Sequence, residues 1–154
     1  MIKVIATDID GVWTDGSMYY DNQGNELKRF HTYDGVGSAR ALAHGIQVVI
    51  LTAENTEIVN ARARKLGIKH VYQGVKNKLQ LMEDICVELG VELSETAYIG
   101  DDLNDLPLLQ KVGFSGAPSN AIEVVKPQVN YICRTAGGQG AFREFVEIIL
   151  QGSL

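Results

Sequence analysis

The hydrophobic positions of this chain alternate between short continuous runs and a spacing of three to four residues. Continuous runs are typical of buried strands, whereas the wider spacing is typical of helices with one apolar face. The runs predict strands over residues 3–7, 46–51, 70–72, 96–99, 114–117 and 131–133. The wider spacing predicts helices over residues 36–44, 55–66, 78–89, 106–112, 121–125 and from 140 onward.

Two of these helices carry more detailed predictions. The helix at 36–44 should turn Ala39, Leu42 and Ala43 toward the core. The short helix at 121–125 should be capped by Ser119 or Asn120, because both side chains can accept a hydrogen bond from a free helix N–H.

Strands that alternate with helices indicate an α/β fold: a single doubly wound, Rossmann-like parallel sheet with right-handed crossovers. The chain has 154 residues, which suits one domain, so we expect a single domain over residues 1–154. Residues 17–31 place two aromatic or apolar runs around a turn-forming segment at 21–25. This pattern predicts a β-hairpin that projects beyond the sheet.

Composition narrows the range of partners and compartments. A formal net charge of −5 and a pI near 5.1 argue against nucleic acid or an anionic membrane surface as a partner. No apolar run approaches the ~20 residues that span a bilayer, and the first residues lack the pattern of a secretion signal. We therefore expect a cytoplasmic protein, in which Cys86 and Cys133 are buried, reduced thiols.

Acidic and hydroxyl side chains follow three of the predicted strands. Asp8 and Asp10 end the first strand, Thr52 follows the second, and Asp101 and Asp102 follow the strand at 96–99. Ligands of doubly wound sheets bind at the carboxyl ends of the strands, where all five residues would meet. Carboxylates in such a group could hold Mg²⁺. An acidic turn after a strand is the alternative for the first pair.

A lysine near this edge would add a phosphate site to the metal site. Lys78 begins a predicted helix, where free N–H groups and the helix dipole add to its positive charge. Lys76 is the nearby competitor, and a solvated surface lysine is the alternative for either. Carboxylates, Mg²⁺, a hydroxyl and a lysine together favour phosphate-ester hydrolysis, whose slow uncatalysed rate calls for such help.

Four segments, in this order, resemble the motifs of the haloacid dehalogenase superfamily: Asp-Ile-Asp-Gly-Val at 8–12, Thr52, Lys78 and Gly-Asp-Asp-Leu-Asn-Asp at 100–105. The resemblance implies that Asp8 is a nucleophile that forms an aspartyl-phosphate and that Asp10 is the general acid and base.

The same resemblance implies the ligands of the site. Mg²⁺ would be held by Asp8, the main-chain carbonyl of Asp10 and Asp101, and the phosphate would be bound by Thr52, Ala53 and Lys78. Asp102 would support the metal's waters, and Asp105 would orient Lys78 by an ion pair. A helix N-cap is the alternative role for Asp102 or Asp105.

Longer stretches resemble the 3-deoxy-octulosonate 8-phosphate phosphatase family: residues 13–16, the hairpin, and residues 30–35, 73–74, 100–105 and 137–144. Its members are capless and act as homotetramers. The intervals between Asp10, Thr52 and Asp101 agree, because they leave no room for a cap domain. The resemblance implies that a neighbouring subunit's hairpin covers each active site, using Met18, Tyr19, Tyr20 and Phe30; alternatively, these residues pack on their own domain.

The residues after Thr52 bear on the substrate. The octulosonate branch carries Gly-Arg there, whereas this chain has Ala53-Glu54. The combination of Glu54 and Lys65 resembles the pattern of a related branch that acts on nonulosonate 9-phosphates, which are compounds related to sialic acid. The resemblance implies that Asp10, Thr32, Glu54 and Lys65 contact the substrate. We therefore expect a nine-carbon 2-keto-3-deoxy sugar acid 9-phosphate, with 3-deoxy-D-manno-octulosonate 8-phosphate as the alternative. Alternatively, Glu54 and Lys65 lie on the surface away from the substrate, and they then do not distinguish the nine-carbon from the eight-carbon ester.

Other functions stay open. The chain could be a phosphatase of looser specificity or a catalytically silent partner subunit. A phosphoacceptor signalling module uses similar groups on a similar sheet, but its acceptor aspartate lies on a middle strand and its acidic pair on the first, an order that differs from this chain.

Overall fold

Six parallel strands form the central sheet, in the order β5-β4-β1-β6-β7-β8. The structure is a computed structural model that describes residues 1–152. The strands are β1 (Val4–Thr7), β4 (Gln47–Leu51), β5 (His70–Tyr72), β6 (Thr96–Ile99), β7 (Phe114–Ala117) and β8 (Tyr131–Ile132). The predicted doubly wound sheet is confirmed, and its strand order reverses between β1 and β6, where such sheets bind ligands.

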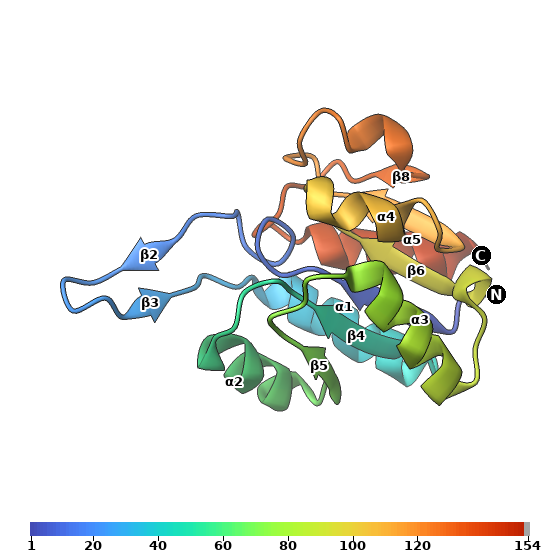
Figure 1. Ribbon diagram of the computed structural model, residues 1–154, viewed down its shortest axis with the longest axis horizontal. Helices are drawn as coiled ribbons and strands as arrows, with labels where there is room; N and C mark the ends of the chain where they lie inside the picture. The colour runs from blue at the N-terminus through green and yellow to red at the C-terminus, as the bar shows by residue number, and fades with distance from the viewer. Residues whose placement is uncertain (153–154) are drawn as a thin grey trace.

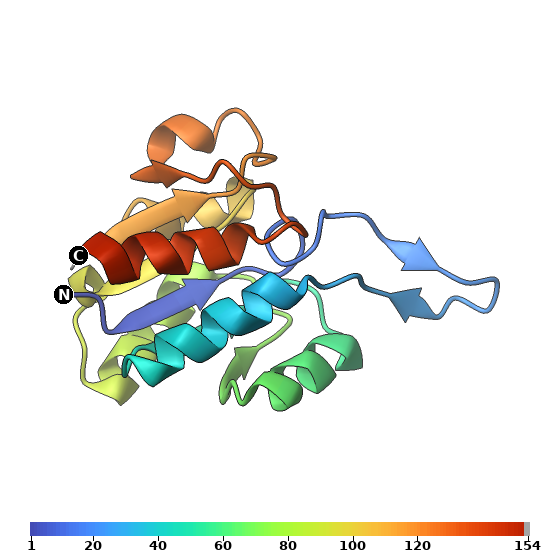
Figure 2. The ribbon, with the colours of Figure 1, turned by 180° about the vertical axis from the view of Figure 1, so that it is seen from behind.

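Helices cover both faces of the sheet (Figures 1 and 2). One face packs against α1 (Thr32–Ala43), α2 (Glu57–Leu66) and α5 (Ala141–Gly152), and the other against α3 (Lys78–Leu89) and α4 (Leu106–Leu109). The longest of these, α1, α3 and α5, have 12 residues each. None of the helices in residues 1–152 has the length and apolar character to cross a membrane.

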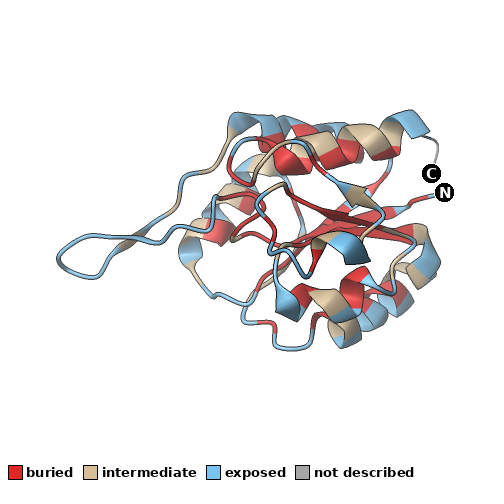
Figure 3. Cartoon of the chain, turned by 90° about the horizontal axis from the view of Figure 1, so that it is seen from above, coloured by how far each residue is buried: buried red, intermediate tan, exposed pale blue. Residues whose placement is uncertain are grey.

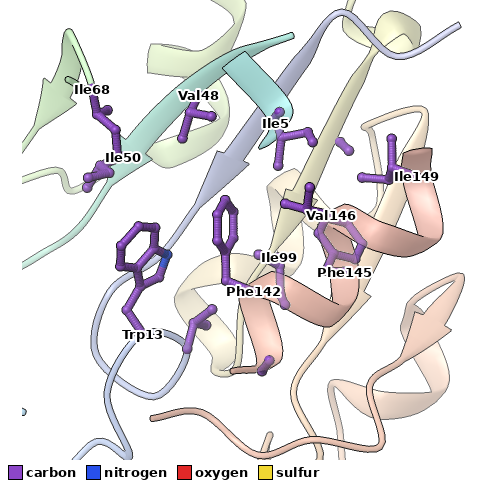
Figure 4. Packing of buried hydrophobic residues seen from close by; sticks show 14 of the residues in the cluster. Ile5, Trp13, Val48, Ile50, Ile68, Ile99, Phe142, Phe145, Val146 and Ile149 are labelled. Carbon is purple, nitrogen blue, oxygen red and sulfur yellow. The ribbon is translucent and has the colours of Figure 1, made fainter. Parts of the chain in front are cut away.

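The core has two halves because alternate side chains of a strand point to opposite faces. Ile5 of β1 packs on the α5 side, where the rings of Trp13 and Phe142 are tilted by 34° with their centroids 4.9 Å apart (Figure 4). Val4 of the same strand belongs to the cluster on the α3 side. Complete burial of a side chain such as Phe142 stabilises the fold by roughly 1.5–3 kcal/mol. Cys86 and Cys133 are buried free thiols, as predicted.

The predicted inner face of the first helix is wrong for two of its three residues, whereas Leu42 packs against the core as predicted. Ala39 and Ala43 are exposed, and α1 buries Asp34, Gly35, Gly37, Ser38 and Ala41 instead. A Cβ on Gly37 would lie 3.0 Å from the Cα of Arg143, so α1 contacts α5 through its smallest residues. The helix also begins at Thr32 rather than at residue 36, because His31 caps it.

Two helices near the carboxyl half are shorter than predicted or absent. Helix α4 ends at Leu109, and residues 121–125 form turns that lead into the 3₁₀ helix η3 (Lys126–Gln128). The Asn120 side chain does not cap a helix, because it donates to the Gly11 carbonyl at 3.0 Å and accepts from the Gly137 N–H at 2.6 Å. These partners come from distant parts of the chain, so local sequence could not indicate them.

The predicted hairpin is present and projects from the body of the molecule (Figure 1). It consists of β2 (Tyr19–Tyr20) and β3 (Glu26–Leu27), which pair antiparallel. Its tip carries little buried surface (Figure 3), and Tyr20 is 63% exposed. Phe30 differs, because it packs against the core of its own chain. The hairpin therefore presents apolar side chains that its own subunit leaves uncovered.

Asp34 is a buried acid at the contact between α1 and α5. Its Oδ1 accepts the Arg143 N–H at 3.0 Å, and its Oδ2 has no hydrogen-bond partner among the described residues. Burial raises the pKa of Asp34 to about 7, although the Arg143 N–H and the nearby Arg62 charge act in the opposite direction. Folding therefore makes this carboxyl bind its proton more tightly.

This raised pKa gives stability a predicted pH dependence. The unfolded chain loses the Asp34 proton near pH ~4, whereas the folded protein keeps it until about pH 7. Between these values the group's contribution to the free energy of unfolding should fall with rising pH, by up to about 1.4 kcal/mol per unit. Asp34→Asn should remove this contribution, so denaturant titrations in EDTA should show its stability relative to wild type rising from pH 5 to 8. Parallel curves would contradict the assignment.

Candidate active site

Side chains from the carboxyl ends of β1, β4 and β6 meet in one cavity of about 270 Å³. It lies at the switch point of the sheet, as expected for a ligand site. The residues predicted for this edge, Asp8, Asp10, Thr52, Asp101 and Asp102, all line it. Gly16, Met18, Ala53, Glu54 and Asn104 complete the lining.

The loop after β1 is shaped so that Asp101 can approach Asp8. Gly11 has a φ of +89°, and a Cβ at this position would lie 1.9 Å from Asp101 Oδ2. The Ile9 carbonyl accepts the N–H groups of residues 12, 13 and 14, which closes the loop tightly. Only glycine satisfies both the backbone angle and the close approach of the carboxylate.

Lys78 lies beneath the cavity, in a buried cluster of charged and polar groups. Its Nζ is 2.7 Å from Asp105 Oδ1, 3.1 Å from Asp8 Oδ2 and 3.1 Å from the Tyr98 hydroxyl. Burial alone would lower the pKa of Lys78, but the carboxylates of Asp8 and Asp105 outweigh it and raise the pKa. The predicted ion pair with Asp105 is present, whereas a solvated surface lysine is excluded.

The carboxylates of this cluster outnumber the Lys78 ammonium group beside them. Burial raises the pKa of Asp8 to about 7, and the nearby Asp105 charge adds to this shift. Burial raises the pKa of Asp101 to about 8, with repulsion from Asp8 and Asp105 as further causes. A divalent cation would relieve both effects by compensating the negative charge.

Three carboxylates are close enough to share such a cation: Asp8, Asp101 and Asp105 offer oxygens within 4.8 Å of one another. Asp105 is already engaged, because it pairs with Lys78 and accepts the main-chain N–H groups of Asp101 and Asp102. Its phenolic neighbour Tyr98 donates to it as well. Asp8 makes the longer of the two carboxylate contacts to Lys78, so Asp8 and Asp101 are the carboxylates better placed to hold a hard cation such as Mg²⁺.

Lys28 is a member of this site that the sequence did not reveal. Its side chain is 1% exposed, and its Nζ lies 2.6 Å from Asp10 Oδ1 and 3.1 Å from Glu26 Oε1. Burial would lower the pKa of Lys28, but its bonds to these carboxylates raise it. The only sequence signal was the spacing of Glu26 and Lys28, which puts both on one side of a strand.

The remaining predicted site residues fall into two groups. Ala53 and Glu54 are exposed residues that line the cavity. Thr32 and Lys65 are exposed and do not line it. Asp102 lines the cavity and also caps the 3₁₀ helix η2 (Leu103–Asp105), so both roles considered for it are compatible.

Known proteins match this chain over nearly its whole length. The family model for haloacid dehalogenase-like hydrolases matches residues 49–144. The 3-deoxy-D-manno-octulosonate 8-phosphate phosphatase of Escherichia coli is 42% identical over 155 residues, which cover 99% of this chain and 82% of the relative. The corresponding enzyme of Salmonella typhi is 41% identical with the same coverage.

Solved structures give the same result in three dimensions. A 3-deoxy-D-manno-octulosonate 8-phosphate phosphatase from Moraxella catarrhalis, in complex with magnesium ion, phosphate ion and KDO molecule, aligns with a TM-score of 0.95 and 40% identity. The match covers 97% of this chain and 86% of that one. The cobalt-bound form of the deoxy-D-mannose-octulosonate 8-phosphate phosphatase from Haemophilus influenzae aligns with a TM-score of 0.93 and 41% identity, and the match covers 97% of this chain and 88% of that one.

Proposed function

The chain belongs to the haloacid dehalogenase-like hydrolases, and on that basis we propose that it is a Mg²⁺-dependent phosphatase of 3-deoxy-D-manno-octulosonate 8-phosphate. The observation that carries the proposal is the joint placement of Asp8, Asp10, Lys78 and Asp101 at one strand edge. The names of the similar enzymes support a sugar-acid phosphate as the substrate.

In the proposed mechanism Asp8 attacks phosphorus, and the bond from phosphorus to the sugar oxygen breaks. Asp10 gives its proton to the leaving oxygen and then takes a proton from the water that hydrolyses the aspartyl-phosphate. Lys78, Thr52 and the main chain at Ala53 bind the phosphate oxygens. Asp8, Asp101 and the Asp10 carbonyl would hold Mg²⁺, which when bound offsets the negative charge of the phosphate.

The eight-carbon substrate replaces the nine-carbon one as the favoured assignment. The expectation of a nonulosonate 9-phosphate depended on Glu54 and Lys65, and only Glu54 lines the cavity of this subunit. The similar enzymes at 42% and 40% identity carry the name of the eight-carbon ester. The sugar-acid class is common to both assignments.

A homotetramer with active sites between subunits is part of the proposal. The cavity of about 270 Å³ is small for a phosphorylated sugar acid and is open to solvent, although a reactive aspartyl-phosphate benefits from exclusion of water. Tyr19 is 43% exposed and Tyr20 is 63% exposed, so these two hairpin residues offer the apolar cover that the site lacks. Met18 is 43% exposed as well, but it lines the cavity of its own subunit. Phe30 is excluded from this role by its packing in its own core. The cytoplasmic location stays a prediction.

The test compares kcat/KM with Mg²⁺ for the 8-phosphate octulosonate, a 9-phosphate nonulosonate and p-nitrophenyl phosphate. We expect the octulosonate ester to be the best substrate and EDTA to abolish all three activities, with recovery on adding Mg²⁺. A preference for the nine-carbon ester would restore the role of Glu54 and Lys65. Turnover of the aryl ester alone would contradict the sugar-acid substrate, and one burst without turnover would favour a phosphoacceptor module.

A further inference from the structure

We propose that Lys28, at the base of the hairpin, is a positioning residue that holds the Asp10 carboxyl group in place for proton transfer. The inference rests on the proposed role of Asp10 as the general acid. Lys28 itself does not line the cavity, whereas Asp10 does, so Lys28 acts from behind the acid.

The burial of Lys28 is the first argument. Lysine side chains are almost never buried unless they are paired, and this one belongs to a residue of intermediate overall exposure that follows β3 at the base of an otherwise exposed hairpin. Its side chain is 1% exposed, and Asp10 and Glu26 are its two anionic partners. The contact at 2.6 Å to Asp10 is the shorter of the two, so the stronger bond is made to the acid in the cavity.

The geometry of the contact is the second argument. Lys28 donates to Oδ1 of Asp10, which leaves Oδ2 as the oxygen that carries the transferred proton. As the bond from phosphorus to the sugar oxygen breaks, its electron pair goes to that oxygen, which takes the proton from Oδ2. The bond to Lys28 fixes the rotation of the carboxyl group during this transfer, and misplacement by ~1 Å can cost roughly 10²-fold in rate.

The test uses leaving groups that differ in their need for a proton. An alkoxide leaves poorly unless it is protonated, whereas p-nitrophenolate is a stable anion and needs little help. We expect Lys28→Met to lower kcat/KM about 10²-fold for the octulosonate 8-phosphate and for glycerol 3-phosphate, used as a second alkyl ester. For p-nitrophenyl phosphate the loss should be smaller than about threefold, and Lys28→Arg should restore most of the alkyl-ester activity.

Three features keep the test decisive. Both ester types are measured on the same preparation, so a partly unfolded variant lowers both rates equally and leaves their ratio unchanged. Arg29→Met is the matched control, because this neighbouring cation is exposed and should leave the ratio at its wild-type value. Asp10→Asn is the reference and should show the same selective loss, at least as large as that of Lys28→Met.

The outcomes separate the two proposals. A selective loss in Asp10→Asn with an unchanged ratio in Lys28→Met would overturn the role of Lys28 and leave the proposed function standing. An equal loss of both ester types in Asp10→Asn would overturn the general-acid assignment and, with it, the role of Lys28.

Discussion

An Asp8→Asn variant is expected to fold like the wild type and to lose its phosphatase activity by roughly 10⁴-fold or more. The amide nitrogen and oxygen of asparagine are too weak as nucleophiles to form the acyl-phosphate, so the first covalent step cannot begin. Steady-state assays with the octulosonate ester and with p-nitrophenyl phosphate measure the loss. It should affect both esters equally, because each needs the same nucleophile.

The fold should tolerate this change. Asp8 Oδ1 accepts the Ile9 N–H at 2.8 Å, and an asparagine oxygen can accept the same bond. Lys78 keeps Asp105 as its closer partner. Burial raises the pKa of Asp8 to about 7, which means that its charged form is disfavoured in the fold, and the variant removes this group. Asp102→Asn is the comparison variant, since that exposed acid would act only through the metal's waters and should change the rate far less than the nucleophile does. An Asp8→Asn protein with substantial turnover would refute the covalent mechanism.

The sequence predicts the sheet and the cavity because both depend on local patterns. Buried strands read as apolar runs, and the residue that follows each run must lie at the carboxyl edge of a parallel sheet. This logic placed Asp8, Thr52 and Asp101 correctly, although they are far apart in the chain. The predicted strand at 46–51 differs from β4 only at its first residue.

Other features depend on contacts that no local pattern records. The inner face of α1 is set by how closely Gly37 approaches α5, so Ala41 is buried whereas the equally apolar Ala39 is exposed. Lys28 is buried because the base of the hairpin folds against the loop that carries Asp10. The hydroxyl of Tyr98 donates to Asp105, although Tyr98 belongs to a strand whose sequence predicts only a buried core position. In each case tertiary contact overrides the one-dimensional signal.

A Lys78→Met variant is expected to lose both activity and stability. The positive charge that would meet the phosphate disappears, which should lower kcat/KM by about 10²–10³-fold or more. Asp8 and Asp105 are left as buried carboxylates without their cation, and breaking a buried ion pair in this way costs roughly 3–5 kcal/mol. Phosphatase assays and denaturant titrations in EDTA at pH 8 measure the two effects separately.

The second substitution Asp105→Asn separates the two losses. In the Lys78→Met background it removes one unpaired carboxylate, so the double variant should regain much of the stability while its activity stays as low as that of Lys78→Met. Lys76→Met is the matched control, because Lys76 is exposed two residues earlier and should keep both activity and stability. Equal losses of activity and stability in Lys76→Met and Lys78→Met would mean that the charge at position 78 has no role of its own in the site. Recovery of activity in the double variant would mean that Lys78 only stabilises the fold, and that the phosphate is bound without it.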